Sequence, residues 1–273
     1  MASPKTVLIT GTSSGIGKSL AKLLNDKGFK VFATARKTES ISDLTALGIT
    51  AFALDVDSPE SITKLKADIA AITGGKLDML INNAGKNLTV PAVDLDMDEV
   101  EGCFRTNLFG TFTPLLIEAK GTIVQIGSVA GIMPYVFGSA YNASKAALHA
   151  YSNTLRVELA PFDVKVITIV TGGVVSNIAR TERVLGESSI YQPITKEYAR
   201  RTKHSQEVGM DTEKYAQSVL KQLLVRSPPR YIWEGFGSYL VWFVSTFMPK
   251  WMMDWYFTRE FNLNKLRQTK KNV

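Results

Sequence analysis

Short apolar runs rich in β-branched residues alternate along the chain with longer segments in which apolar residues recur every three or four positions. The short runs predict buried strands, and they lie at residues 6–9, 30–33, 50–54, 79–81, 122–126, 165–170 and 230–233. The longer segments predict amphipathic helices, the clearest of them at residues 18–27, 60–72 and 140–159. Alternating strands and helices are typical of a parallel sheet covered on both faces. The pattern therefore predicts an α/β fold with a single doubly wound parallel sheet of about seven strands.

The pattern changes twice towards the end of the chain. Residues 180–225 are polar and basic, and residues 235–257 are dense in aromatic residues and methionine before a basic tail. We expect residues 1–234 to form one domain that includes a substrate lid at about 176–226, and residues 235–273 to form a hydrophobic C-terminal extension. The apolar run at 239–244 is interrupted by polar residues well before the roughly 20 apolar residues that a membrane-spanning helix needs.

Composition and charge limit which classes of binding partner are expected. Hydrophobic residues make up 45% of the 273 residues, enough for a large core, and the formal net charge is +7. Such a charge suits nucleic acid, an anionic membrane surface or an anionic substrate, but no nucleic-acid motif is present, so that partner is not expected. No metal-ligand cluster is visible, so no metal is expected. A single cysteine, Cys103, and a start without signal-peptide features indicate the cytosol.

The loop after the first strand, "TGTSSGIG" at residues 10–17, allows two interpretations. Its spacing matches G-x-S-x-G, which would make Ser13 a hydrolase nucleophile on a strand-to-helix turn. It also matches a glycine-rich loop that binds the phosphates of a dinucleotide at a helix N-terminus. A hydrolase needs a partner histidine, and the two available, His149 and His204, fall in a predicted helix and in a basic polar segment. The phosphate interpretation is preferred, and the Ser13-dependent lipid ester hydrolase is kept as an alternative.

Four further motifs follow the loop in order: "NNAG" at 82–85, Asn107 in "TNLFG", Ser128 in "IGS", and Tyr141 with Lys145 in "YNASK". Together with the glycine loop they resemble the short-chain dehydrogenase/reductase family over residues 5–176, and more loosely to residue 233. The resemblance implies a Rossmann-type sheet and the catalytic residues Asn107, Ser128, Tyr141 and Lys145. In one respect the chain departs from the family: the segment between Asn107 and Ser128 is about two helical turns shorter than usual.

The spacing of Tyr141 and Lys145 gives the resemblance a chemical basis. Residues four apart lie on one face of a helix and can reach the same ligand. Reducing a ketone requires a hydride and a proton for the carbonyl oxygen. We expect Tyr141 to donate the proton, with the Lys145 ammonium favouring its phenolate form. The resemblance adds that Ser128 binds the substrate oxygen and that Lys145 binds the nicotinamide ribose.

The residues after the second strand indicate which dinucleotide binds. An NAD site carries an acidic residue there, whereas this chain has Arg36 and Lys37, which offer cations to the 2′-phosphate of NADPH. NADPH and physiological reduction are therefore expected. The cofactor-binding residues implied by the glycine loop, these cations and the family resemblance are Gly11, Ser13, Ser14, Gly15, Ile16, Gly17, Arg36, Lys37, Asp55, Val56, Asn83, Ala84, Gly85, Tyr141, Lys145, Gly172, Val174 and Ser176.

Within the family, the segments around Tyr141 and Gly172 are similar to those of fungal NADPH-dependent 1-acyldihydroxyacetone-phosphate reductases. This resemblance implies a ketone that carries an acyl chain on one side and a phosphate on the other. Basic residues of the predicted lid offer a phosphate site, and they are Arg180, Arg183, Lys196, Arg200, Arg201 and Lys203. A broader carbonyl, steroid or retinoid reductase is the alternative within the same class.

The C-terminal extension suits an interface between water and lipid. Its aromatic residues are of the kind that gathers at membrane surfaces, namely Tyr239, Trp242, Trp251, Trp255 and Tyr256. Basic residues favour anionic headgroups, and they are Lys250, Arg259, Lys265, Arg267, Lys270 and Lys271. We expect peripheral attachment to the cytosolic face of the endoplasmic reticulum or to a lipid droplet, and a cytoplasmic protein if the extension is instead a hydrophobic lid or a contact in a homo-oligomer.

Overall fold

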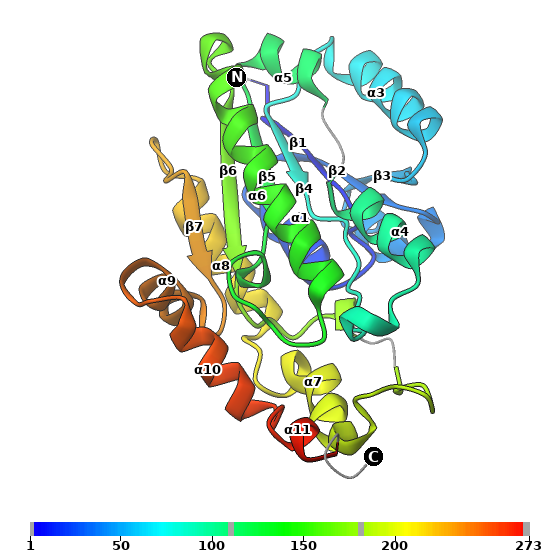
Figure 1. Ribbon diagram of the computed structural model, residues 1–273. Coiled ribbons are helices and arrows are strands. Elements are labelled where there is room, and N and C mark those ends of the chain that lie inside the picture. Colours follow the sequence, from blue (N-terminus) through cyan, green and yellow to red (C-terminus); the bar gives the residue numbers. More distant parts are fainter. Residues whose placement is uncertain (1–2, 109–111, 180–182, 270–273) are drawn as a thin grey trace.

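A computed structural model describes residues 3–108, 112–179 and 183–269 of the chain. Its centre is one seven-stranded parallel sheet with the strand order β3-β2-β1-β4-β5-β6-β7 (Figure 1). The strands are β1 (Thr6–Ile9), β2 (Lys30–Ala35), β3 (Thr50–Ala53), β4 (Met79–Asn82), β5 (Thr122–Ile126), β6 (Lys165–Thr171) and β7 (Tyr231–Glu234). The predicted Rossmann-type, doubly wound α/β sheet is confirmed, with strand ends that differ from the prediction by at most two residues.

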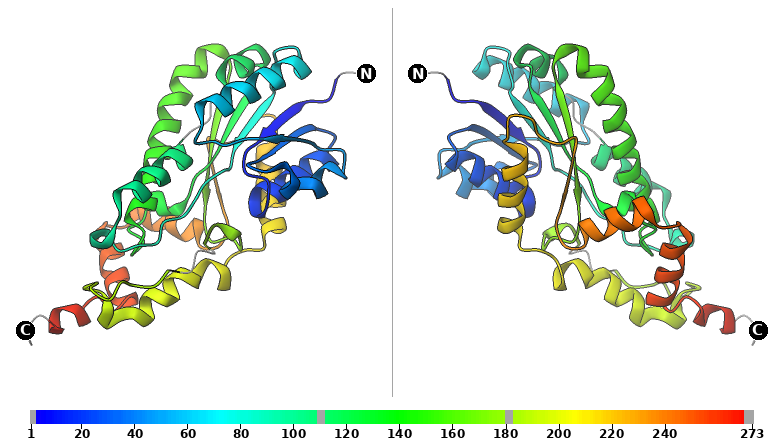
Figure 2. Two further views of the ribbon diagram at one scale, coloured as in Figure 1. Left: turned by 90° about the vertical axis from the view of Figure 1, so that its right-hand side faces the viewer. Right: turned by 90° about the vertical axis from the view of Figure 1, so that its left-hand side faces the viewer.

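Helices cover both faces of the sheet, as Figure 2 shows in edge-on views. One face packs against α1 (Gly15–Asp26), α2 (Ser42–Thr45) and α8 (Thr212–Leu223). The other face packs against α3 (Pro59–Thr73), α5 (Thr113–Ala119) and α6 (Ser139–Leu159), and α4 (Met97–Leu108) lies against α6. The helix that carries Asn107, α4, is described as far as Leu108, and residues 109–111 lie outside the described part of the chain.

The apolar runs form strands because both of their faces are buried. In β1, Val7 and Ile9 point into the core beside α1 and α8, while Leu8 points into the core beside α3 and α6. All three side chains are fully buried, and each is worth roughly 1.5–3 kcal/mol of transfer free energy. Buried parallel strands need no polar face, which explains the continuous apolar sequence.

Local signals set the helix ends. The Ser58 hydroxyl accepts a hydrogen bond from the Ser61 amide at 3.1 Å, Pro59 opens α3, and Gly74 ends it in the left-handed conformation at φ 66°. Serine at the N-cap and glycine after the last turn satisfy backbone groups that the helix itself leaves free.

The last part of the chain lies across one end of the sheet. After β7 come α9 (Ser238–Phe247), α10 (Trp251–Glu260) and α11 (Lys265–Thr269). The first of them lies against β7, and the last lies beside the turn that leads into α7 (Thr195–Glu207), at the same end of the molecule in both views of Figure 2. Phe257 of α10 and Phe261, which directly follows that helix, share a small core with Phe137, Ile194 and Tyr198. Within the described residues, no helix has the length and apolar character required to cross a membrane.

Candidate active site

The carboxyl ends of β1, β4, β5 and β6 open into one cavity of about 950 Å³, at the edge of the sheet where α/β folds bind ligands. Most of the sequence-predicted site residues line it. Those at its wall are Gly11, Ser13, Ser14, Gly15, Ile16, Arg36, Asp55, Val56, Asn83, Ala84, Gly85, Ser128, Tyr141, Lys145, Gly172, Val174 and Ser176. Three predicted residues are not part of the wall, and they are Gly17, Lys37 and Asn107.

The glycine loop is held by side chains of the neighbouring strand end. The Asn83 amide donates to the carbonyl oxygens of Thr10 at 2.8 Å and Gly11 at 2.9 Å. In return, the Thr10 hydroxyl accepts from the backbone amides of Asn83 at 3.0 Å and Ala84 at 2.9 Å. These contacts fix the loop so that the N-terminus of α1 faces the cavity, where it attracts an anion.

The glycines allow the loop to turn tightly and to pack closely against its neighbours. Gly11 and Gly15 have φ of 69° and 58°, a region that other residues seldom adopt. A Cβ at Gly17 would overlap the Asn83 side chain and lie 2.5 Å from the Gly11 carbonyl oxygen. Gly17 therefore acts from behind the wall, by letting α1 pack closely against the loop.

The two basic residues after β2 separate in the structure. Arg36 is exposed at the cavity wall, close to Asp55 and Val56 in the lining, whereas Lys37 is exposed outside the lining. A cation at this end can meet a phosphate in the cavity, and Arg36 is the residue placed to do so.

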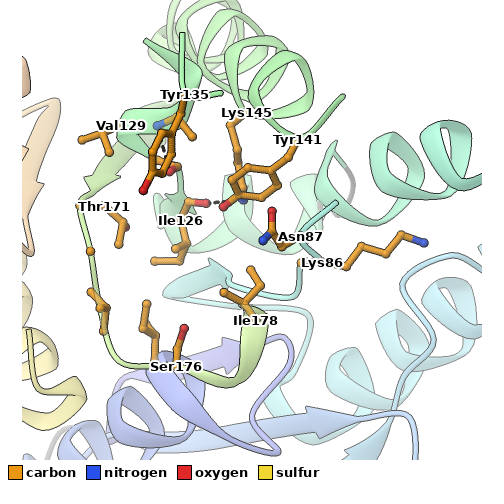
Figure 3. A pocket seen from close by; sticks show the side chains of 18 of the residues that line it. Lys86, Asn87, Ile126, Val129, Tyr135, Tyr141, Lys145, Thr171, Ser176 and Ile178 are labelled. Atoms are coloured by element: carbon orange, nitrogen blue, oxygen red, sulfur yellow. Dashed lines mark hydrogen bonds between the residues drawn. The ribbon is translucent and has the colours of Figure 1, made fainter. Parts of the chain in front are cut away.

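The catalytic residues meet at the end of β5. Lys145 is buried, and its Nζ donates to the carbonyl oxygen of Ile126 at 2.9 Å. Tyr141 is half-buried beside it, with the Lys145 Nζ 5.9 Å from the centre of the Tyr141 ring. Figure 3 shows the Tyr141 ring in front of Lys145, with Ser176 across the cavity. The Ser128 hydroxyl accepts from the Ala130 amide at 3.1 Å and also lies within hydrogen-bonding reach of the Tyr141 side chain.

Burial sets the proton affinities of this pair. It raises the pKa of Tyr141 to about 12, a rise that the Ser128 hydroxyl and the Arg201 charge oppose. Burial also lowers the pKa of Lys145 to about 8. In the protein alone, desolvation of the phenol outweighs the charges around it, and the expected effect of Lys145 together with an oxidised nicotinamide stays a prediction. Tyr141 thus keeps its proton at neutral pH, which is the form that a proton donor needs.

Asn107 acts from behind the wall. Its side chain accepts from the Lys86 amide at 2.9 Å and donates to the Lys86 carbonyl oxygen at 3.1 Å and to the Ser144 hydroxyl at 2.9 Å. The Ser144 hydroxyl in turn donates to the Tyr141 carbonyl oxygen at 2.7 Å. Asn107 is therefore joined to Tyr141 through a serine that the sequence analysis passed over.

The sequence model of the family described as short chain dehydrogenase matches residues 5–184. The chain belongs to the short-chain dehydrogenase family. It is 42% identical to short-chain dehydrogenase virD of Hypocrea virens over 96% of this chain and 94% of that protein. It is 38% identical to the NADPH-dependent 1-acyldihydroxyacetone phosphate reductase of Saccharomyces cerevisiae over 98% and 95%. A solved short-chain dehydrogenase from Streptomyces avermitilis superposes with a TM-score of 0.74 at 30% identity, over 85% and 88%.

Membership in the short-chain dehydrogenase family makes the chain an oxidoreductase and removes the support for the Ser13 hydrolase. The histidines have other bonds: the His149 Nε2 accepts from the Ser128 amide at 3.3 Å, and the His204 Nδ1 pairs with the Tyr135 hydroxyl at 2.7 Å. Ser13 itself lies on the phosphate-binding loop at the cavity wall.

Sequence reasoning missed three side chains of this dehydrogenase site. Besides Ser144, His149 holds the Ser128 amide, and burial lowers its pKa to about 4, so it accepts as the neutral imidazole. Asn87 points towards Tyr141 in Figure 3, and its buried Oδ1 has no hydrogen-bond partner among the described residues. The signal for His149 was its spacing, since it lies four residues after Lys145 and therefore on the same helix face.

The C-terminal helices close the other side of the dehydrogenase cavity. Apolar side chains of α9, of α10 and of the residue that directly follows α10 form this wall, and they are Leu240, Val241, Val244, Met252, Met253, Trp255, Tyr256, Phe257 and Phe261. The C-terminal residues thus form part of the cavity wall.

Proposed function

We propose that this short-chain dehydrogenase uses NADPH to reduce a lipid ketone, with 1-acyldihydroxyacetone phosphate as the best-supported substrate and 1-acylglycerol 3-phosphate as the product. The observation that carries the proposal is the single cavity, which joins the glycine loop and the Tyr141–Lys145 pair to the apolar wall of α9 and α10. One ligand-binding space therefore offers a dinucleotide site, an acid and room for an acyl chain.

The residues present fit NADPH. A Cβ at position 15 would lie 3.4 Å from the Ser176 side chain, and because Gly15 has none, this part of the cavity stays open. The N-terminus of α1 faces the open space and attracts a phosphate. Arg36 would bind the 2′-phosphate, and Asp55 and Val56 would border the adenine. The relative from Saccharomyces cerevisiae is named for NADPH dependence, which agrees with the cation at Arg36.

Side chains of the protein supply the proton for the ketone oxygen. When bound, NADPH supplies the hydride for the ketone carbon. Tyr141 donates its hydroxyl proton to the ketone oxygen, and Ser128 orients that oxygen by a hydrogen bond. The Lys145 ammonium stabilises the charge left on Tyr141, and Asn107 with Ser144 holds the backbone from which Tyr141 projects.

The substrate test uses purified protein in detergent and follows NADPH oxidation. The substrates are 1-acyldihydroxyacetone phosphate, its unphosphorylated analogue and a simple steroid ketone. Turnover that favours the phosphorylated lipid and is lost in Tyr141→Phe supports the proposal. Turnover of neutral ketones alone would replace it with the broader carbonyl reductase, which the largely apolar wall also accommodates.

We further propose that the extension rests on a lipid surface, such as the cytosolic face of the endoplasmic reticulum or a lipid droplet. Large apolar side chains of α9 and α10 are exposed, and they are Tyr239, Leu240, Trp242, Phe243, Phe247, Trp251, Trp255 and Tyr256. Lys250, Arg259, Lys265 and Arg267 accompany them with positive charge, while Lys270 and Lys271 lie outside the described residues. Several of these apolar residues also line the cavity, so a lipid could enter from the surface that the protein contacts.

Sedimentation with vesicles tests this surface. Phosphatidylcholine vesicles with and without phosphatidylserine are mixed with wild type, Trp251→Ser and the control Val157→Ser, which removes an exposed apolar residue from α6 instead. Binding that requires phosphatidylserine and weakens only in Trp251→Ser supports attachment. Absence of binding, together with self-association lost in Trp251→Ser, would assign the surface to a second copy.

A further inference from the structure

The basic residues of the predicted lid do not form one cluster. Arg183 binds both carboxylate oxygens of Glu99, at 2.7 and 3.0 Å, and Arg200 pairs with Glu260 at 2.9 Å. Lys196 and Lys203 are exposed and lie outside the cavity lining. Arg180 lies outside the described residues. These residues are either paired with a carboxylate, exposed to solvent or outside the described part of the chain, and in this they differ from Arg201.

Arg201 is a buried cation at the cavity wall. Its side chain is 6% exposed and forms part of the lining. Its Nε donates to the Val136 carbonyl oxygen at 3.1 Å, and its guanidinium carbon lies 3.6 Å from the centre of the Tyr135 ring. Among the described residues, no carboxylate forms an ion pair with it and no acceptor binds its two terminal nitrogens.

A buried guanidinium without a counter-ion is unfavourable, and stacking on Tyr135 offsets only part of the cost. Burial accordingly lowers the pKa of Arg201. The terminal nitrogens carry four N–H groups in a planar fork, the geometry that binds a phosphate through two oxygens. An anion bound in the cavity would therefore provide the counter-ion that no described residue provides.

The position of Arg201 separates it from the phosphate sites of the dinucleotide. Those sites lie at the glycine loop and at Arg36, whereas Arg201 projects from α7 and stacks on Tyr135. Tyr135 in turn contacts Phe257 and Phe261 of the apolar wall, with ring centres 5.7 and 6.3 Å apart. Other charged or titratable groups near Arg201 are Tyr141 and Tyr198. The Arg200–Glu260 pair and His204, whose Nδ1 is hydrogen-bonded to the Tyr135 hydroxyl, lie on the same side.

We propose that Arg201 binds the phosphate of the ketone substrate and so selects phosphorylated lipids over neutral ones. The proposal rests on the proposed function and assigns its specificity to one side chain. The phosphate meets Arg201, the acyl chain follows the adjoining wall of α9 and α10, and the ketone between them reaches Tyr141.

The experiment compares kcat/KM for 1-acyldihydroxyacetone phosphate and for its unphosphorylated analogue in four proteins. They are wild type, Arg201→Gln, Arg201→Lys and the control Lys203→Gln, which removes one charge from the exposed face of the same helix. We expect Arg201→Gln to reduce the preference for the phosphorylated ketone by about 10- to 100-fold, the range of a charged hydrogen bond. Arg201→Lys should retain part of the preference because it keeps the charge without the fork. Lys203→Gln should keep all of it.

An equal loss on both ketones in Arg201→Gln would overturn the proposal, because Arg201 would then only support the wall or Tyr141. A shift of the pH profile of kcat in that variant would identify Tyr141 as the group affected. If wild type reduces only neutral ketones, the proposed function fails, and inhibition by 1-acylglycerol 3-phosphate then decides the role of Arg201. Inhibition that Arg201→Gln abolishes would retain the anion site, and no inhibition would remove it.

Discussion

The two halves of the cavity are built by different means. The dinucleotide half is made largely of backbone, and its glycine loop, with Gly11 and Gly17 held close to the Asn83 side chain, comes from the first 83 residues of the chain. The substrate half is made of side chains from segments far apart in sequence, such as Tyr135, Arg201 and Phe257. A site whose shape depends on the backbone restricts which residues can occupy it, and the restriction is visible as a sequence motif. A wall of side chains can be built from many different sequences and has no such motif. The predictions below test this division.

The largest effect is expected where the two halves meet. Tyr141→Phe removes the proton donor but keeps the ring, so kcat should fall by about 10²- to 10⁴-fold. NADPH affinity, measured by fluorescence titration, should stay within a few-fold of wild type. A variant that loses both equally would show that Tyr141 mainly supports the cofactor half.

A methyl group behind the glycine loop should damage the dinucleotide half alone. Gly17→Ala places a Cβ against Asn83 and the Gly11 carbonyl oxygen, and overpacking of this kind costs about 1–3 kcal/mol. We expect NADPH affinity to fall by about 5- to 100-fold, measured by titration. Gly186→Ala is the matched control, because nothing lies within 4 Å of a Cβ there.

Truncation of one aromatic ring should damage the substrate half alone. Phe257 is buried in the small core that joins α10 to Tyr135 and Phe261. Phe257→Ala should raise KM for a long-chain ketone about tenfold, the equivalent of roughly 1.4 kcal/mol of lost apolar contact. NADPH affinity should not change. An equal loss of NADPH affinity would show that the two halves are not independent.

The smallest effect concerns pH. Burial lowers the pKa of Lys145 to about 8 from 10.5, so its positive charge is present below pH 8 and is lost as pH rises through that value. We expect NADPH affinity to decrease a few-fold between pH 7 and 9, since phosphate groups are already ionised there. Because the unfolded chain keeps this proton up to about pH 10.5, the free energy of unfolding should rise over the same range. Lys145→Met should bind NADPH weakly at every pH, and a pH dependence that persists in this variant would contradict the assignment.

Much of the fold and of the dinucleotide half could be predicted because their signals are local. The strand runs, the glycine spacing and the four-residue step from Tyr141 to Lys145 each depend on a few neighbouring positions. The burial and unpaired state of Arg201 depend instead on how α7 docks on residues 133–137, which no short pattern records. The raised pKa of Tyr141 could not be predicted for a related reason, since desolvation is a property of the assembled site. The division into residues 1–234 and 235–273, and the roles of the site residues, remain predictions.

The hydrogen bonds between the loop after β6 and the end of β7 have a consequence for biosynthesis. Gly172 donates to the Glu234 carbonyl oxygen at 2.8 Å, and Gly173 and Phe236 exchange two bonds of 2.9 Å. These contacts complete the dinucleotide half only after residue 236 has left the ribosome, and α10 follows a further 15 residues later, as it begins at Trp251. At translation rates of about 5–20 residues per second, the nascent chain passes through a short interval in which the sheet is whole while the apolar wall is still absent. We expect the apolar side chains that α10 covers, such as Phe137 and Tyr198, to be exposed during that interval and to be covered once residues 251–260 have emerged and docked.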